Sequence, residues 1–504
     1  MARKKAERAD EKVEGVLTLD QAAAELGISR STLQRMLRQG NIRGFKVGRQ
    51  WRFRRSDLDK LSRMSHPSAA GVSVAGLDGL VADLAAHAAV TGEVIMEPVL
   101  PDYPTTEEEV AVERLLHTIL LAAVKDTASD VHIDPIRADT HVRFRIDGVL
   151  HPVMQAPRDV HKALAACIKY HADIPVDQQQ IAQDGRFRFR SGESEYDVRV
   201  ATMPSIYGES VVMRLLDQRP HVLTLDHPNL GMIAEDMARF KRALAAPMGL
   251  IIAAGPTGSG KTSLLYAGLQ HIASPEIKTI TVEDPVEYTF PWVTQAAVNV
   301  RAGFTYEQAG RAIARHDPDV VMLGEIRPGS VAQSAVQIAL TGHLVLSVLH
   351  AYSAAGAIVR LLDMGIEPYL LADTLLCVIA QRLIRRVCSE CARPDQPPRD
   401  LLSPLVERAR AGGYELPESP RFVRGAGCEH CRNTGYHGLM GMFEVLEPSV
   451  GIARLIAQHE SADVIEAAAV QNGMTTLAAD GLRKAAEGIT TVAEVSRVLS
   501  WQLE

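Results

Sequence analysis

The sequence has no run of about 18 consecutive apolar residues, so we expect no bilayer-spanning helix. Its first ten residues, MARKKAERAD, are basic but no apolar stretch follows them, so we expect no secretory signal and a cytoplasmic location. Cysteine is scarce, with six in 504 residues, which excludes a disulfide-stabilised scaffold. Four of the six cysteines nevertheless form two close pairs, and in a reducing compartment that spacing indicates a bound metal.

The remaining composition is ordinary for a globular protein: 46% of the residues are hydrophobic, 23% are charged, and the net charge is −7. A length of 504 residues favours about three or four domains. Between Leu250 and about Arg386 short apolar strands alternate with helices, which predicts an α/β lobe with a parallel sheet. Composition and periodicity divide the chain into a charged tail at 1–15, a small compact unit at 16–63, a linker with a short helix at 64–105, an α+β lobe at 106–218, the α/β lobe at 219–386, and a cysteine-containing helical region at 387–504.

The strongest motif is a glycine-rich loop between a buried strand and a helix. The apolar residues 249–254 lead into GPTGSGKT, which fits G-x-x-x-x-G-K-[ST], and a helical stretch follows. The loop consists of Gly255, Pro256, Thr257, Gly258, Ser259, Gly260, Lys261 and Thr262. Its glycines let backbone N–H groups surround phosphates, and the helix N-terminus adds a favourable dipole. We expect ATP here, with Lys261 on the β- and γ-phosphates and Thr262 as a ligand of Mg²⁺.

A second apolar strand, DVVML, ends in Gly324 and Glu325 and suggests the hydrolytic carboxylates. Such strands usually end in Asp-Glu, with the Asp holding Mg²⁺ through water and the Glu polarising the attacking water, so Gly324 leaves one carboxylate missing. The segment EDPVE supplies two further acids, Glu283 and Glu287. We expect Glu325, with one or both of these, to orient the water and the metal ion. The alternative is that Glu283 or Glu287 is a solvated loop acid.

Two histidines flank the next apolar strand, LVLSVL. His343 and His350 are seven residues apart, at opposite ends of this strand, so both cannot contact one γ-phosphate unaided. We expect one of them to sense the phosphate and the other to be structural. A plain hydrogen-bonding role is the alternative for each.

Together with further segments, these motifs resemble the ATPases of type II secretion and type IV pilus assembly. The matching segments are SDVHIDP (129–135), RFRIDG (143–148), QDGR (183–186), GE (208–209) with RLL (214–216), the glycine-rich loop, EDPVE (283–287), RHDPDV (315–320), GEIR (324–327), TGH (341–343), QRLIRR (381–386) and GMTTLAADG (473–481). They follow the family's order from about residue 106 to the C-terminus. The chain departs from the family's pattern at His316, Pro328, Val348 and the segment 176–180.

The resemblance implies a two-lobed subunit, in which an α+β lobe precedes a RecA-like P-loop lobe. It also implies a homo-hexameric ring at the inner membrane, with a membrane platform protein as partner. In such rings ATP lies between lobes, and arginines from the other lobe or a neighbouring subunit meet its phosphates. By position, the candidates are Arg199, Arg214, Arg311 and Arg315. The alternative for each arginine is a surface or interface salt bridge.

The two cysteine pairs are CSEC and CEHC, with Cys388, Cys391, Cys428 and Cys431 as their members. Two C-x₂-C pairs complete a tetrahedral site that is typical of structural Zn²⁺, because protein ligands fill all four positions. Redox pairs are the alternative, but neither pair follows the βαβ pattern expected of them. The tetracysteine insertion resembles that of assembly and secretion motors rather than that of retraction motors.

The front unit resembles an excisionase- or MerR-like winged helix-turn-helix. Thr18 is expected to cap its first helix, a second helix starts at Arg30, and residues 44–55 form a basic hairpin. Its excess of basic residues suits phosphates. The residues expected to contact DNA are Arg30, Ser31, Thr32 and Arg35 in a major groove and Arg49 and Arg52 on the wing. Docking of a protein adaptor is the alternative role.

These observations predict a motor that hydrolyses ATP to power pilus assembly or protein secretion, with Mg²⁺ at the nucleotide and Zn²⁺ at the cysteines. The rival hypothesis comes from the front unit. It is an ATP-switched DNA-binding regulator, or a DNA-translocating motor, that uses the helix-turn-helix.

Overall fold

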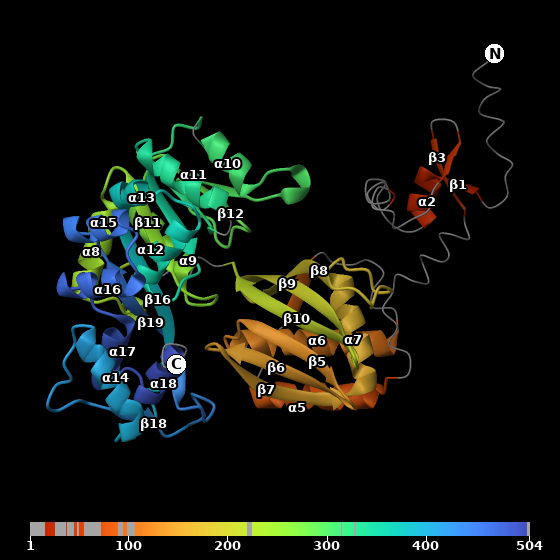
Figure 1. The fold of residues 1–504 in the computed structure, drawn as a ribbon. Helices are drawn as coiled ribbons and strands as arrows, with labels where there is room; N and C mark the ends of the chain where they lie inside the picture. The colour runs from red at the N-terminus through yellow and green to blue at the C-terminus, as the bar shows by residue number, and fades with distance from the viewer. Residues whose placement is uncertain are drawn as a thin grey trace, which may run out of the picture. The chain divides into compact units, whose positions relative to one another are not determined.

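The computed structural model describes residues 16–25, 37, 45–47, 50–54, 72–88, 94–97, 106–218, 224–313, 315–326 and 329–500. The chain divides into two compact units, 1–218 and 219–504 (Figure 1). Among the described residues, no helix has both the length and the apolar character needed to cross a bilayer.

The first described elements are a short helix and three strands. Strand β1 (Val16–Thr18) precedes helix α2 (Leu19–Glu25), and β2 (Phe45–Val47) and β3 (Gln50–Arg54) join β1 in an antiparallel sheet of order β1-β3-β2. Helix α2 begins after Thr18 because the Thr18 hydroxyl accepts a hydrogen bond from the Gln21 N–H at 3.2 Å, while Gln21 Oε1 accepts one from the Thr18 N–H at 2.9 Å. Leu19, Ala22 and Phe53 form a small core.

The rest of the first unit is a seven-stranded antiparallel sheet in the order β4-β8-β9-β10-β5-β6-β7. The strands are β4 (Val94–Glu97), β5 (Asp130–Ile136), β6 (Asp139–Ile146), β7 (Val149–Pro157), β8 (Gln183–Ser191), β9 (Ser194–Ser205) and β10 (Gly208–Asp217); the helices are α5 (Val74–Ala88), α6 (Glu107–Lys125) and α7 (Arg158–His171). Alternate residues of β6 are buried, so one face of the sheet carries the core and the other is polar. Helix α6 begins at a capping box in which Thr106 and Glu109 exchange hydrogen bonds.

The segment 64–105, expected to be a linker with a short helix, contributes regular structure to this lobe. Helix α5 has 15 residues and strand β4 pairs with β8 at the sheet edge. Leu77, Leu84, Val94 and Met96 are buried in the lobe's core. The expected helix is therefore present but packed into the lobe, and strand β4 is an element that the Ser-, Ala- and Gly-rich composition did not reveal.

The second unit has a seven-stranded sheet in the order β13-β12-β14-β15-β11-β16-β19, in which every neighbouring pair is parallel except β16 and β19. Its parallel strands are β11 (Gly249–Ala254), β12 (Thr279–Glu283), β13 (Val293–Ala297), β14 (Val320–Leu323), β15 (Leu344–Leu349) and β16 (Leu375–Val387). Along β11, Leu250, Ile252 and Ala254 join one core cluster while Ile251 and Ala253 join another. Both faces of the strand are therefore buried, which explains its continuous apolar sequence.

Helices cover both faces of this sheet. Helices α8 (Ala234–Leu244) and α9 (Lys261–Ile272) contribute to one core cluster, and α10 (Tyr306–Ile313), α11 (Gly329–Leu340), α12 (Ala354–Asp363) and α13 (Pro368–Thr374) contribute to the other. The 3-10 turn η1 (Pro228–Leu230) precedes α8, and a second, η2 (Val300–Ala302), lies between β13 and α10.

The C-terminal region belongs to the same body as the parallel sheet. Its elements are β17 (Ala392–Pro394), α14 (Arg399–Ala411), β18 (Val423–Gly425), β19 (Tyr436–Leu446), α15 (Val450–Ala457), α16 (Ala462–Gln471), α17 (Leu477–Ala486) and α18 (Val492–Leu499). Strand β19 pairs antiparallel with β16 and completes the seven-stranded sheet, while β17 and β18 form a separate two-stranded sheet. Residues of the last four helices lie in the main core cluster.

Candidate nucleotide site and cysteine cluster

The glycine-rich loop lies at the carboxyl edge of the parallel sheet, between β11 and the N-terminus of α9. Gly258 and Gly260 have left-handed φ values of +77° and +85°, which residues with side chains rarely adopt. A Cβ atom at Gly260 would also lie 2.7 Å from Nε2 of Gln381 on β16, so the end of the Gln381 side chain would have to shift to admit one. The loop can therefore close around the first turn of α9, where free N–H groups and the helix dipole favour an anion.

Lys261 and two uncharged polar groups lie at this loop. Lys261 is 6% exposed, and its Nζ donates a hydrogen bond to the Pro256 carbonyl at 2.7 Å. Burial, together with the neighbouring Arg382 guanidinium, lowers the pKa of Lys261 to about 8. Ser259 Oγ and Gln381 Oε1 are buried, and among the described residues neither has a hydrogen-bond partner. A buried cation and an unsatisfied hydroxyl at a helix N-terminus fit a bound phosphate.

The sheet brings Glu283 and Glu325 to this same edge. Strand β12 ends at Glu283, and the neighbouring strand β14 ends two residues before Glu325. Ends of adjacent parallel strands are the usual place for ligand-binding groups in α/β proteins. A Cβ atom at Gly324 would lie 2.9 Å from the Tyr306 hydroxyl, so this tyrosine fills the space in which an aspartate side chain would begin.

Glu283 is a buried acceptor rather than a solvated acid. The residue is 2% exposed, and its carboxylate accepts hydrogen bonds from the Tyr266 hydroxyl, from the Thr281 hydroxyl at 2.5 Å and from Gln295 Nε2 at 3.2 Å. Glu287 lies in the loop after β12, partly buried, and its backbone N–H donates to the Tyr266 hydroxyl at 3.3 Å. Both carboxylate oxygens of Glu283 are thus occupied by protein donors.

The two histidines lie at opposite ends of strand β15. Strands β11 and β15 run parallel and in register along their full lengths, so His350 is level with the glycine-rich loop and His343 is level with the start of β11. His350 Nε2 lies 3.6 Å from a carboxylate oxygen of Glu325. His343 Nδ1 lies 3.0 Å from the Ile338 carbonyl near the end of α11. Of the two, His350 is therefore the histidine at the end of the strands that carries the glycine-rich loop.

The four candidate arginines fall in two places. Arg311 on α10 is 75% exposed and donates to Glu307 at 2.6 Å, and Arg315 is exposed just beyond that helix. Arg199 and Arg214 lie directly opposite each other on β9 and β10, on the polar face of the sheet in the first unit.

A third arginine, Arg186 on β8, lies opposite Arg199 and extends this row. Like charges opposite each other destabilise a sheet, and Asp130 offsets part of this repulsion by accepting a hydrogen bond from Arg214 Nε at 2.8 Å. A row of three arginines suits an anionic ligand. Sequence reasoning missed Arg186 as a site residue, although it lies in a segment that carries the family resemblance.

The four cysteines converge on one point. The Sγ–Sγ distances are 3.8 Å for Cys388 and Cys428, 3.8 Å for Cys391 and Cys431 and 3.7 Å for Cys428 and Cys431, and all four sulfurs lie within 4.8 Å of one another. A tetrahedron with metal–sulfur bonds of about 2.3 Å has edges of about 3.8 Å.

The backbone also prepares this cluster for thiolates. The N–H groups of Cys428 and Gly435 donate to Cys431 Sγ, each at 3.3 Å. Burial raises the pKa of Cys431, but these N–H groups, together with the Cys428 and Cys391 thiols, lower the pKa to about 6. The cysteine cluster could therefore hold a metal ion.

Most residues expected to contact DNA cannot be placed. Arg30, Ser31, Thr32, Arg35 and Arg49 lie outside the described residues. Arg52 was expected on the exposed wing, but it lies in β3, the central strand of its sheet, and is only 7% exposed. Arg52 is therefore not an exposed phosphate contact, whereas Arg54 at the end of β3 is exposed.

The sequence matches two known protein families. Residues 105–497 match the sequence family described as "Type II/IV secretion system protein". The chain belongs to this family. Residues 16–62 match a second family, described as "Helix-turn-helix domain". The predicted resemblance is confirmed, and the chain is a P-loop ATPase of the secretion and pilus-assembly group with a helix-turn-helix domain in front.

Relatives cover most of the chain. The type II secretion system ATPase E of Vibrio cholerae serotype O1 is 40% identical over 397 residues, which are 79% of this chain and 77% of that protein. The type IV pilus assembly ATPase PilB of Thermus thermophilus is 39% identical over 393 residues, which are 78% of this chain and 43% of that protein.

Two solved structures share the fold. The X-ray structure of the Legionella pneumophila ATPase DotB has a TM-score of 0.56 and 17% identity, and the match covers 80% of this chain and 98% of that one. The pilus retraction motor PilT with bound ADP has a TM-score of 0.51 and 23% identity, with 75% and 95% covered. The predicted α/β fold, with an α+β lobe before a RecA-like P-loop lobe, is confirmed.

Proposed function

We propose that this chain is a motor ATPase that hydrolyses ATP to power type IV pilus assembly or type II protein secretion. The observation that carries the proposal is the buried Lys261 in a left-handed glycine loop, with Glu325 at the same sheet edge, in a member of the secretion family. Two relatives are ATPases of secretion and of pilus assembly. The chain acts in the cytoplasm and reaches the inner membrane through a platform protein of such a system.

The test is steady-state ATP hydrolysis by the purified, assembled chain. Lys261→Ala removes the cation that meets the phosphates and should abolish turnover. Lys241→Ala is the matched control, because Lys241 on α8 pairs with the exposed Asp226 at 2.8 Å, away from the loop. Wild-type turnover in Lys261→Ala would refute the proposal.

Among the acids, we assign Glu325 to polarising the attacking water and Glu287 to orienting it. The occupied carboxylate of Glu283 suits a structural role in holding the loop after β12. Mg²⁺ bound with ATP supplies positive charge at the β- and γ-phosphates, and Thr262, at the start of α9, is the residue in sequence position to hold it. Glu325→Gln should retain ATP binding and lose turnover by about 10²- to 10⁴-fold, and an unchanged kcat would contradict this assignment.

The active form is a homo-hexamer in which Arg199, Arg214, Arg311 and Arg315 approach the phosphates from another lobe or subunit. The Arg186–Arg199–Arg214 row supports an anion-binding surface on the first unit. Alanine at Arg199 or Arg315 should lower kcat by about 10³- to 10⁵-fold in assembled rings. Arg188→Ala is the control, because Arg188 on β8 is 57% exposed and lies near Glu195 and Asp197. If Arg199→Ala and Arg315→Ala rings both hydrolyse ATP normally, the arginine assignment is wrong.

The cysteine cluster binds structural Zn²⁺. The sulfur geometry supports this, since four protein ligands leave no position for a substrate. Elemental analysis should find one zinc ion per chain. A zinc-free chain that keeps the same melting temperature and assembly would contradict a structural role.

The helix-turn-helix binds duplex DNA or, alternatively, docks a protein adaptor. The match to a helix-turn-helix family supports a recognition role for this domain. If it binds DNA, the full chain should shift a duplex at low salt and lose affinity steeply as salt rises. Arg54→Glu should weaken that shift while Arg188→Glu on the other sheet should not. No shift at low salt favours the adaptor.

This domain also carries the second candidate function, a DNA-binding regulator or DNA-translocating motor switched by ATP. The two candidates differ in what a cell loses with Lys261→Ala. Loss of fibre assembly or export supports the motor. Transcriptional changes with fibres and export intact support the regulator.

A further inference from the structure

The loop at 284–292 connects β12 to β13 and carries Glu287. One side chain beneath it, Gln295 on β13, makes three hydrogen bonds. Its Oε1 accepts from the Phe290 N–H at 2.9 Å, and its Nε2 donates to the Tyr288 carbonyl at 2.8 Å and to Glu283 at 3.2 Å. Gln295 therefore fixes residues 288–290 of the loop to strand β13.

The loop is also fixed at Glu287 to a different element, helix α9, which follows the glycine-rich loop. Tyr266 on α9 is 1% exposed, its hydroxyl donates to Glu283 and it accepts from the Glu287 N–H at 3.3 Å. Its ring packs edge-on against Phe290 at 4.8 Å and against Tyr288 at 6.1 Å between ring centres. Burial and the neighbouring Glu283 carboxylate raise the pKa of Tyr266, so its hydroxyl stays protonated and able to donate.

We propose that Tyr266 and Gln295 are positioning residues that hold Glu287 at a fixed place relative to the nucleotide. Helix α9 starts at Lys261, so Tyr266 follows the phosphate-binding turn by about one and a half helical turns on a rigid element. The same helix then binds the phosphates at its first turn and fixes the position of the Glu287 backbone, because the Glu287 N–H donates to the Tyr266 hydroxyl. The inference rests on the proposed ATPase function and deepens it.

Removing only the hydroxyl separates positioning from packing. Tyr266→Phe keeps the aromatic contacts with Phe290 and Tyr288 but removes the bonds to Glu283 and Glu287. A displacement of about 1 Å in a catalytic group can cost about 100-fold in rate, so kcat should fall roughly 10- to 100-fold. The Kd for an ATP analogue should stay within about twofold, because the residues of the glycine-rich loop are unchanged.

A double-mutant cycle tests whether Tyr266 acts through Glu287. The kcat of assembled, full-length rings is measured for wild type, Tyr266→Phe, Glu287→Gln and the double variant. If Tyr266 only positions Glu287, the double variant should be as slow as Glu287→Gln alone. Tyr436→Phe is the matched control, because it removes another partly buried tyrosine hydroxyl, which lies 2.7 Å from Thr491 Oγ1, and it should leave kcat within about twofold.

The inference would be overturned if the fold-decreases in kcat of the two single variants multiplied in the double variant. It would also be overturned if kcat were unchanged in Tyr266→Phe or in Glu287→Gln. If Tyr266→Phe does not assemble, Gln295→Leu replaces it in the same cycle, since Gln295 ties the same loop without lying on α9. These failures differ from failure of the proposed function, in which wild type and Lys261→Ala would show the same turnover.

Discussion

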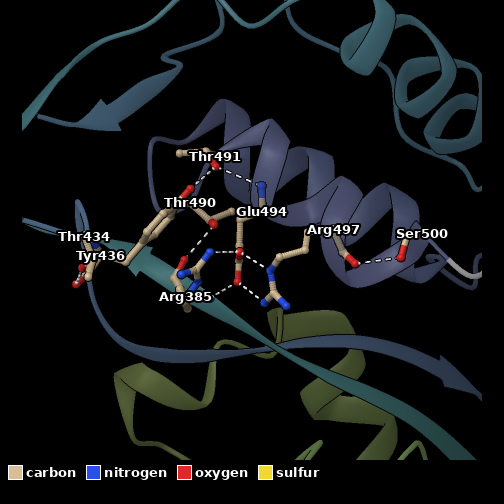
Figure 2. A network of polar contacts seen from close by, with 8 residues as sticks. All are labelled: Arg385, Thr434, Tyr436, Thr490, Thr491, Glu494, Arg497 and Ser500. Carbon is tan, nitrogen blue, oxygen red and sulfur yellow. Dashed lines mark hydrogen bonds and ion pairs between the residues drawn. The ribbon is translucent and has the colours of Figure 1, made fainter. Parts of the chain in front are cut away.

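Glu494 on α18 is an acid enclosed by two arginines, as Figure 2 shows. Its side chain is 0% exposed and accepts hydrogen bonds at 2.7 Å from Arg385 Nη2 and from Nε and Nη2 of Arg497. The backbone N–H of Arg385 on β16 adds a fourth bond at 3.1 Å. Burial alone would raise the pKa of Glu494, but the bonds from Arg497 and Arg385 lower it from 4.5 to about 2. The ion pair between Arg385 and Glu494 thus joins helix α18 to the central sheet.

Glu494→Gln keeps the shape of this side chain and removes its charge. The difference between a pKa of 4.5 and one of about 2 corresponds to at most about 3 to 4 kcal/mol, and solvent reduces this free energy because Arg497 is 50% exposed. Because the folded pKa is lowered, the stabilisation is fully present above pH 4.5 and is lost as the pH falls through about 2. At pH 7 we expect α18 to open more easily by about 2 to 3 kcal/mol, which is roughly 30- to 150-fold in population.

Amide hydrogen exchange at pH 7 measures this opening locally, without assuming that the whole chain unfolds in one step. Peptides covering 492–499 and 383–387 should exchange roughly 30- to 150-fold faster in Glu494→Gln. Ser500→Ala is the matched control, because it removes only the bond from the Ser500 hydroxyl to the Arg497 carbonyl at 3.0 Å. Exchange within about threefold of wild type in Glu494→Gln would refute the claim that this charge network holds α18.

Three further predictions concern the nucleotide site and the cysteines. Because the pKa of Lys261 is lowered to about 8, the Kd for an ATP analogue should rise about tenfold between pH 7 and pH 9, and an unchanged Kd in equilibrium dialysis would contradict this. Gly260→Ala should weaken nucleotide binding more than Gly258→Ala does. Both glycines are left-handed, but only a Cβ at Gly260 displaces the Gln381 amide, which lies 2.7 Å away, and equal losses would argue against that contact. Cys428→Ser should lower zinc content well below one ion per chain by elemental analysis, and full occupancy would exclude Cys428 as a ligand.

The sequence by itself determined the features whose chemistry is contiguous along the chain. The loop at 255–262 places its glycines and lysine within eight residues, so its pattern identifies it without knowledge of the fold. The buried strands were predictable for a similar reason, because residues covered on both faces form short continuous apolar runs. The ordered series of family segments from about residue 106 onward extended this local information to the two-lobed fold.

The tertiary structure alone decided which side chains meet. Helix packing brings Tyr266 to Glu283, and strand pairing brings Gln295 to the same carboxylate. Strand pairing also shows that His350, not His343, is level with the glycine-rich loop and that Arg186 lies opposite Arg199. These relationships depend on register between segments far apart in sequence, and a shift of one residue would reverse the face on which each side chain lies. Burial likewise depends on the tertiary structure: Arg52 looks like an exposed wing residue in the sequence, but it is only 7% exposed in the structure.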